Sequence, residues 1–135
     1  MNHNTVMGHR MVTDMVLLGG DGVEPVRAEL RHHRRDPLAV EMRLSIDREP
    51  AVGWVFARDL LIQGLHRPSG IGDVRLYPVN ESVIIELRSA AGKAVLLSYL
   101  PDIEGFVRHI VSAVPVGAEI AHDDVERELF ELGQP

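Results

Sequence analysis

The sequence predicts an α+β domain built on antiparallel β-sheet, with about seven strands, a short helix after the fourth strand and two C-terminal helices. Apolar and polar residues alternate with period two in several segments, and glycine, proline and asparagine separate these segments. A 3.6-residue apolar period occurs briefly after the fourth strand and for longer near the end. The length of 135 residues fits one domain. We therefore expect a flexible leader at 1–10 and a single domain at 11–135.

The first three strands follow one another closely. Residues 11–18 have a composition typical of a strand and end at a glycine-rich turn. Residues 26–33 alternate strictly, which indicates a half-buried second strand. Asp36-Pro37 marks the next turn, and residues 40–47 alternate again. The second and third strands are therefore expected to form a hairpin.

The charges predict the register of that hairpin. If Glu29 lies opposite Arg43 and Arg31 opposite Glu41, unlike charges face each other across the strands. A slip of two residues would place Arg31 opposite Arg43, which is unfavourable by a few tenths of a kcal/mol. The favoured register also pairs apolar residues, namely Leu30 with Met42 and Val26 with Ile46.

The fourth strand leads into the short helix. Val52, Trp54 and Phe56 share one face of this strand, but Val55 on the opposite face is also apolar, so both faces are expected to be covered. An apolar stripe of the helix follows at Ala57, Leu60, Leu61 and Leu65. Gly64 and Pro68 are signals that end a helix.

The rest of the chain predicts three more strands and two helices. Residues 73–77, 83–88 and 93–100 indicate an antiparallel meander. Residues 103–114 keep a helical apolar period up to Pro115. A last helix is expected over 123–132, where Asp123 can cap the first turn.

The composition narrows the possible functions. Fourteen basic and twenty acidic residues give a net charge of −6, the wrong sign for a protein held on phosphate by charge alone. The absence of cysteine excludes thiolate nucleophiles and Cys-based zinc sites. No segment has the apolar core of a signal peptide or the roughly 20 apolar residues of a membrane helix. We expect a cytoplasmic protein without a transmembrane segment.

No motif predicts a catalytic, cofactor or metal site. Gly70-Ile71-Gly72 lacks the Lys-Ser/Thr pair of a phosphate-binding loop and precedes a strand, so it indicates a loop that needs positive φ. His32 and His33 are adjacent on a strand and point to opposite faces, so they cannot grip one ion together. Ser69 and His66 are close in sequence but lack the strand–turn–helix elbow of a hydrolase. We therefore expect a protein that is not an enzyme.

Two features suggest binding instead. The basic run at 31–35 could present cations to single-stranded nucleic acid, but it lacks stacking aromatics, so a solvated hairpin tip is favoured. Ile62 is an apolar residue on the outward face of the short helix, which is typical of a subunit or partner interface. A neighbouring loop of the same chain that covers Ile62 is the alternative.

Two segments of the sequence resemble a known family. W-V-F-A-R-D-L-L at 54–61, followed by G-L-H-R-P-S-G-I-G-D-V at 64–74, resembles the signature segment of the SsgA-like proteins. V-P-V-G-A-E at 114–119 resembles a second segment of that family. Chain length and element order are also similar from about Thr13 to Leu132.

The resemblance implies a non-enzymatic regulator of sporulation-specific cell division in filamentous actinobacteria, acting at the septum. Its partners would be FtsZ, whose ring some members help to recruit and position, or other SsgA-like proteins. The resemblance also implies a homotrimer of sheets and helices similar to the Whirly-type single-stranded nucleic-acid-binding fold. That similarity keeps nucleic-acid binding as the alternative function, although a shared fold does not transfer a function. The subtype stays open.

The resemblance also identifies motif residues, which are Trp54, Phe56, Arg58, Asp59, Leu60, His66, Arg67, Pro68, Gly70, Gly72 and Asp73. The apolar members Trp54, Phe56 and Leu60 are expected in the core. Together with the outward-facing Ile62, the charged members give the candidates for protein interaction, which are Arg58, Asp59, Ile62, His66 and Arg67.

Overall fold

The computed structural model describes residues 8–19, 22–45, 51–90 and 92–118, and shows an α+β fold with seven strands and two helices in these ranges. All seven strands belong to one antiparallel sheet in the order β4-β3-β2-β1-β7-β6-β5. The elements are β1 (His9–Gly19), β2 (Gly22–His33), β3 (Asp36–Ser45), β4 (Val52–Ala57), α2 (Arg58–Gly64), β5 (Val74–Val79), β6 (Ser82–Ser89), β7 (Gly92–Tyr99) and α3 (Leu100–Ala113).

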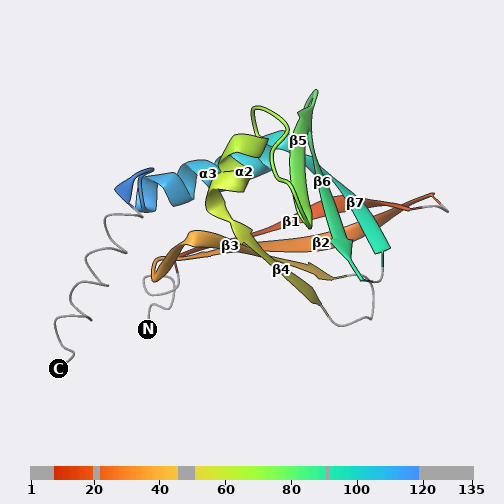
Figure 1. Ribbon diagram of the computed structural model, residues 1–135, viewed down its shortest axis with the longest axis horizontal. Coiled ribbons are helices and arrows are strands. Elements are labelled where there is room, and N and C mark those ends of the chain that lie inside the picture. Colours follow the sequence, from red (N-terminus) through yellow and green to blue (C-terminus); the bar gives the residue numbers. More distant parts are fainter. Residues whose placement is uncertain (1–7, 20–21, 46–50, 91, 119–135) are drawn as a thin grey trace.

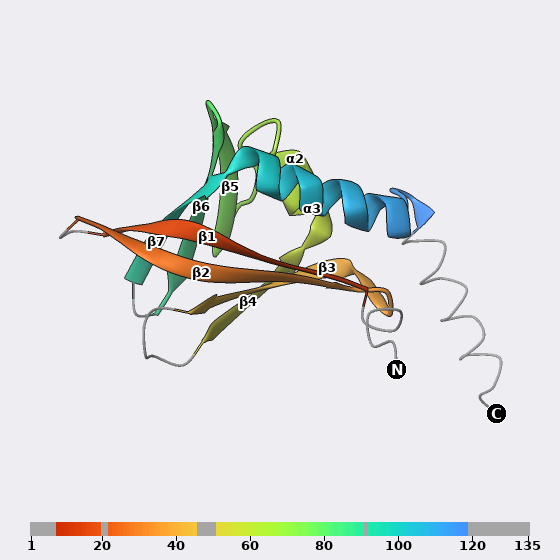
Figure 2. The same cartoon turned by 180° about the vertical axis from the view of Figure 1, so that it is seen from behind.

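The sheet curls, and both helices lie on its concave side (Figures 1 and 2). Alternate side chains of the strands point into this concavity and pack against the helices in one apolar core. Phe106 and Ile110 of α3 and Leu61 of α2 are among its most deeply buried members. Thr13 of β1 also donates a hydrogen bond to Asp102 in the first turn of α3, at 2.9 Å.

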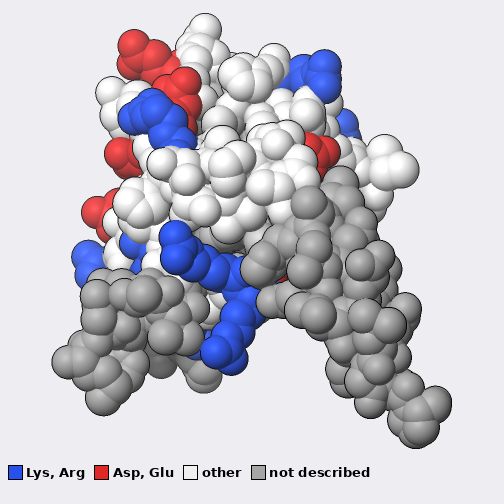
Figure 3. Space-filling model, turned by 90° about the vertical axis from the view of Figure 1, so that its left-hand side faces the viewer, with Lys and Arg blue, Asp and Glu red and all other residues white. Residues whose placement is uncertain are grey.

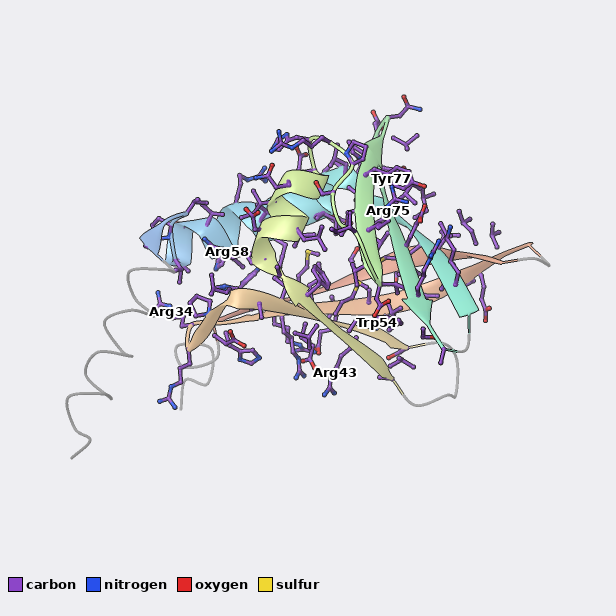
Figure 4. All side chains as sticks on the ribbon, viewed as in Figure 1. Arg34, Arg43, Trp54, Arg58, Arg75 and Tyr77 are labelled. Carbon is purple, nitrogen blue, oxygen red and sulfur yellow. The ribbon has the colours of Figure 1, made fainter. Side chains whose placement is uncertain are left out.

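The convex side of the sheet has no helix over it among the described elements (Figure 1). Arg43 points away from the helices on this side (Figure 4). Val55 of β4 also lies on this side and is 68% exposed. The expectation that both faces of β4 are covered is therefore wrong for the described chain, because both helices pack on the Trp54 and Phe56 side.

The predicted hairpin register is confirmed. Glu29 lies opposite Arg43, Arg31 opposite Glu41 and Leu30 opposite Met42. The predicted pairing of Val26 with Ile46 lies outside the described residues. The predicted position of the turn is wrong, because the register shifts between His32 and His33, Arg34 and Arg35 form the turn, and Asp36 and Pro37 lie in β3.

Three other boundaries differ from the predictions. β1 begins at His9, inside the predicted flexible leader, because His9 pairs with His32 and its ring stacks on His109. α3 begins at Leu100, three residues early, with Pro101 in its first turn, where proline is favoured. The turn after β5 lies at Asn80-Glu81, which leaves Pro78 inside the strand. The helix predicted over 123–132 lies outside the described residues, and the Whirly-type similarity stays a prediction.

The two edge strands of the sheet differ. β5 contains Pro78, which has no N–H to donate, and Ser69 forms an isolated bridge with Leu76 on its outer side. The bridge consists of two backbone hydrogen bonds, of 2.8 and 2.9 Å. β4 has neither feature within the described chain. One edge is therefore blocked and the other is open.

Candidate interaction surface formed by helix α2 and the loop to strand β5

Helix α2 and the loop at 65–73 form one exposed surface, which we call the α2–β5 surface. The loop is held at its base by the bridge between Ser69 and Leu76. Gly70 has φ +99°, and a side chain there would meet the Val74 carbonyl oxygen at 2.4 Å. Positive φ and the close approach both require glycine at this position, which confirms the prediction for the glycine pair.

Ile71 at the tip of this loop is 100% exposed. It sits between Gly70 and Gly72, and both glycines have positive φ. A fully exposed isoleucine on a braced loop is available for a contact with another molecule, because the loop holds it in place away from the core. From the sequence, this stretch is predicted only as a loop that needs positive φ, and Ile71 is not among the predicted interaction residues. The available signal was an apolar residue between two glycines, where no regular element can bury it.

The structure exposes three of the five predicted interaction residues. Asp59 lies in the first turn of α2, and His66 and Arg67 begin the loop. Arg67 donates a hydrogen bond from Nη2 to Oε1 of Gln63, one helical turn earlier. Ile62 is half-buried and packs against the core, so it does not stand fully outward as predicted. Cover by a neighbouring loop stays a prediction.

Arg58 was predicted to be exposed, and this prediction is wrong. Its side chain is 2% exposed and lies between the helices (Figure 4). Nη1 donates a hydrogen bond to the carbonyl oxygen of Ile110 in the last turn of α3, at 3.2 Å. The physical reason is the helix start. Because α2 begins at Arg58 instead of Ala57, the buried stripe runs through Arg58, Leu61 and Leu65, at spacings of three and four.

A second cluster brings together histidines that are far apart in the sequence. The rings of His9 and His109 stack with centroids 3.6 Å apart. Burial, and then the charges of His109 and His32, lower the pKa of His9. Burial also lowers the pKa of His32, despite a 3.0 Å hydrogen bond from its Nε2 to the Pro37 carbonyl oxygen. Among the residues described, no three metal-ligating side chains are grouped to hold an ion.

The basic run at 31–35 does not form a continuous patch. Arg31 pairs with Glu29 and Glu41 on the convex side, and His32 is buried. Only Arg34 and Arg35 of the run are exposed cations. For nucleic-acid binding, this run therefore offers two exposed arginines. It contains no Phe, Tyr or Trp on which a base could stack.

The described residues show no metal-ligating cluster, and the α2–β5 surface contains much of the first motif segment. The comparison with families decides the assignment. Residues 26–119 match the family described as Streptomyces sporulation and cell division protein, SsgA. The chain belongs to the SsgA family. This is a non-enzymatic family of cell-division proteins, as the resemblance predicted. The match includes the whole α2–β5 surface.

Relatives and solved structures agree with this assignment. The chain is 44% identical to the sporulation-specific cell division protein SsgB of Streptomyces coelicolor, over 80% of this chain and 82% of that protein. It is 36% identical to SsgB of Frankia casuarinae, over 85% and 82%. A solved structure from work on SsgB mutations in Streptomyces coelicolor superposes with a TM-score of 0.79, at 39% identity, covering 84% of this chain and 93% of that chain.

A crystal structure of the SsgA-like sporulation-specific cell division protein from Thermobifida fusca gives a TM-score of 0.82, at 29% identity. It covers 91% of this chain and 93% of that one. In sequence and fold the chain is therefore SsgB-like. None of the described helices is long and apolar enough to span a membrane.

Proposed function

We propose that this SsgB-like protein acts in sporulation-specific cell division at the septum, by binding the division protein FtsZ through the α2–β5 surface. The fully exposed side chain of Ile71 carries this proposal. The isoleucine stands on a loop that is braced at Ser69 and Leu76, so little conformational entropy is lost when a partner covers it.

The charged neighbours of Ile71 fit the rim of such a contact. Asp59, His66 and Arg67 are exposed on the same helix and loop. An apolar centre with a polar rim is the usual anatomy of a protein interface. Arg58 has no place in this contact, because it is buried beneath the surface.

Binding of the full chain to FtsZ polymers in a co-sedimentation assay tests the proposal. Ile71→Ser should weaken binding at least about tenfold, since central apolar contacts are often worth more than about 1.4 kcal/mol. The melting temperature should not change, because Ile71 contacts no core residue at full exposure. Val23→Ser is the matched control, a second exposed apolar residue on β2 away from this surface.

Unchanged binding by Ile71→Ser, or equal loss with Val23→Ser, would refute this surface. If the wild type does not bind FtsZ, the FtsZ proposal fails.

We also propose a homotrimer that uses the convex side of the sheet. Val55 of β4 and Val12 of β1 are exposed there, with no described element over them. Light scattering on the full chain should give three times the monomer mass, and Val55→Lys should lower it. A monomeric wild type would refute the trimer, while leaving the Ile71 contact to its own test.

A further inference from the structure

The end of the molecule where α3 finishes combines an apolar cavity with exposed cations. The cavity has a volume of about 330 Å³ and is lined by Ala113, Val114, Pro115, Ala118 and Arg34. Four of these five residues are apolar and come from the end of α3 and the turn after it. Arg34 comes from the turn between β2 and β3. The lining therefore suits a segment with both apolar and acidic side chains.

The two exposed arginines at this end, Arg34 and Arg35, have no ion-pair partner among the described residues. Arg34 lies at the same end of the molecule as the buried Arg58 (Figure 4). Figure 3 faces this end and shows a group of basic side chains low in the middle of the view, with the acidic side chains nearer its edges. This end therefore has a positive local charge on a protein that is acidic overall.

The sequence supplies a complementary segment. Residues 119–135 contain six acidic residues and one arginine, a net charge of −5 out of −6 for the whole chain. The apolar residues of this segment include Ile120, Val125, Leu129, Phe130 and Leu132. The family match ends at residue 119, the first residue of this segment.

The point of attachment favours this segment over other occupants. Ala118, the last described residue, is itself part of the cavity wall. Residues 119–135 therefore begin at the cavity, and no linker has to be ordered before the segment reaches it. A tethered segment binds at an effective concentration near millimolar for short links, which an untethered acidic partner must exceed.

We propose that the acidic segment 119–135 docks on this cavity and on Arg34 and Arg35 of the same molecule. The segment covers a basic end that would otherwise attract acidic partners, and leaves the α2–β5 surface free. Its apolar residues fill the cavity, and its carboxylates face the two arginines. Because the arginines are exposed, their contribution falls as salt increases.

The absence of cysteine makes a direct test possible in the full chain. Asp36→Cys beside the basic turn and Gln134→Cys near the C-terminus give the only two sites for spin labels. Pulsed electron paramagnetic resonance should then show one narrow distance distribution at low salt. Reversal of Arg34 and Arg35 to glutamate should broaden it, and high salt should have the same effect on the unreversed protein.

Two further variants make the test decisive. Arg88→Glu on β6 is the matched control, an exposed arginine in another part of the sheet, and should leave the distribution narrow. Changing Glu126 and Glu128 to lysine in the charge-reversed protein should restore the narrow distribution. This rescue separates a charge contact from simple damage to the turn.

Dilution of the labelled protein with unlabelled protein identifies the molecule that is contacted. A narrow distance that survives dilution supports docking within one chain. A narrow distance that disappears assigns the segment to a second copy and overturns the proposal. A broad distribution in the wild type, unchanged by charge reversal, also overturns it.

Discussion

Replacement of Arg58 by alanine should destabilise the fold. The side chain is 2% exposed and donates a hydrogen bond to the Ile110 carbonyl oxygen, so truncation leaves a buried acceptor without this donor and a void between the helices. Loss of a hydrogen bond from a charged group costs about 1.5–3 kcal/mol. The void adds to this, so we expect a loss of about 2–4 kcal/mol in the free energy of unfolding.

Thermal unfolding followed by circular dichroism measures this effect. For a domain of this size the expected loss lowers the melting temperature by at least about 6 °C. Arg67→Ala is the matched control, because its partner Gln63 lies on the surface and exposed pairs contribute little. A melting temperature for Arg58→Ala equal to that of Arg67→Ala would refute the structural role of Arg58. A division defect of Arg58→Ala should accompany a loss of folded protein.

Gly64→Ala and Gly105→Ala should change stability in opposite directions, as measured by urea unfolding. A Cβ at Gly64 would lie 2.6 Å from the Cβ of buried Leu76, and this overpacking costs about 1–3 kcal/mol, more than alanine gains in helix propensity. A Cβ at Gly105 meets only a side-chain nitrogen at 3.7 Å. Gly105→Ala should therefore raise the free energy of unfolding by up to about 1 kcal/mol. Destabilisation by both would contradict this. Stability should also fall as pH drops below about 6.5, because the pKa values of His9 and His32 are lowered in the folded state and the unfolded state then binds more protons. Melts of a variant with glutamine at both positions should show a flatter pH dependence, and an equally steep one would exclude these two histidines.

The strand pattern of this protein could be predicted because it depends on local alternation and on pairs of opposite charge. The Glu29–Arg43 and Arg31–Glu41 pairs predict the register that the hairpin adopts. The register shift between His32 and His33 is a local irregularity of the backbone, and the alternation of apolar and polar residues does not predict it. The turn was therefore placed at Asp36-Pro37, two residues late.

The candidate site was predicted only in part, because the burial of its side chains depends on details of the backbone that the sequence pattern does not give. The motif lies on the α2–β5 surface, and Asp59, His66 and Arg67 are exposed there as predicted. A shift of one residue in the start of α2 changed which side chains face the core, and Arg58 moved from the surface to the interior. Polarity alone does not predict whether a long cationic side chain such as that of Arg58 is buried. Its burial depends on the carbonyl oxygen of Ile110, which belongs to a helix distant in sequence. The exposure of Ile71 likewise depends on the brace at Ser69, which is a long-range feature of the fold.

The unequal edges of the sheet restrict how copies of this chain can join. With Pro78 and the Ser69 bridge on β5, strand-to-strand addition is available only at β4 within the described sheet. Pairing of β4 with the β4 of another copy is a twofold arrangement, which is complete once two chains have met. Threefold symmetry needs a contact between two different patches, so pairing of β4 edges alone cannot produce it. Within the described sheet, this geometry therefore disfavours an endless ribbon of shared strands.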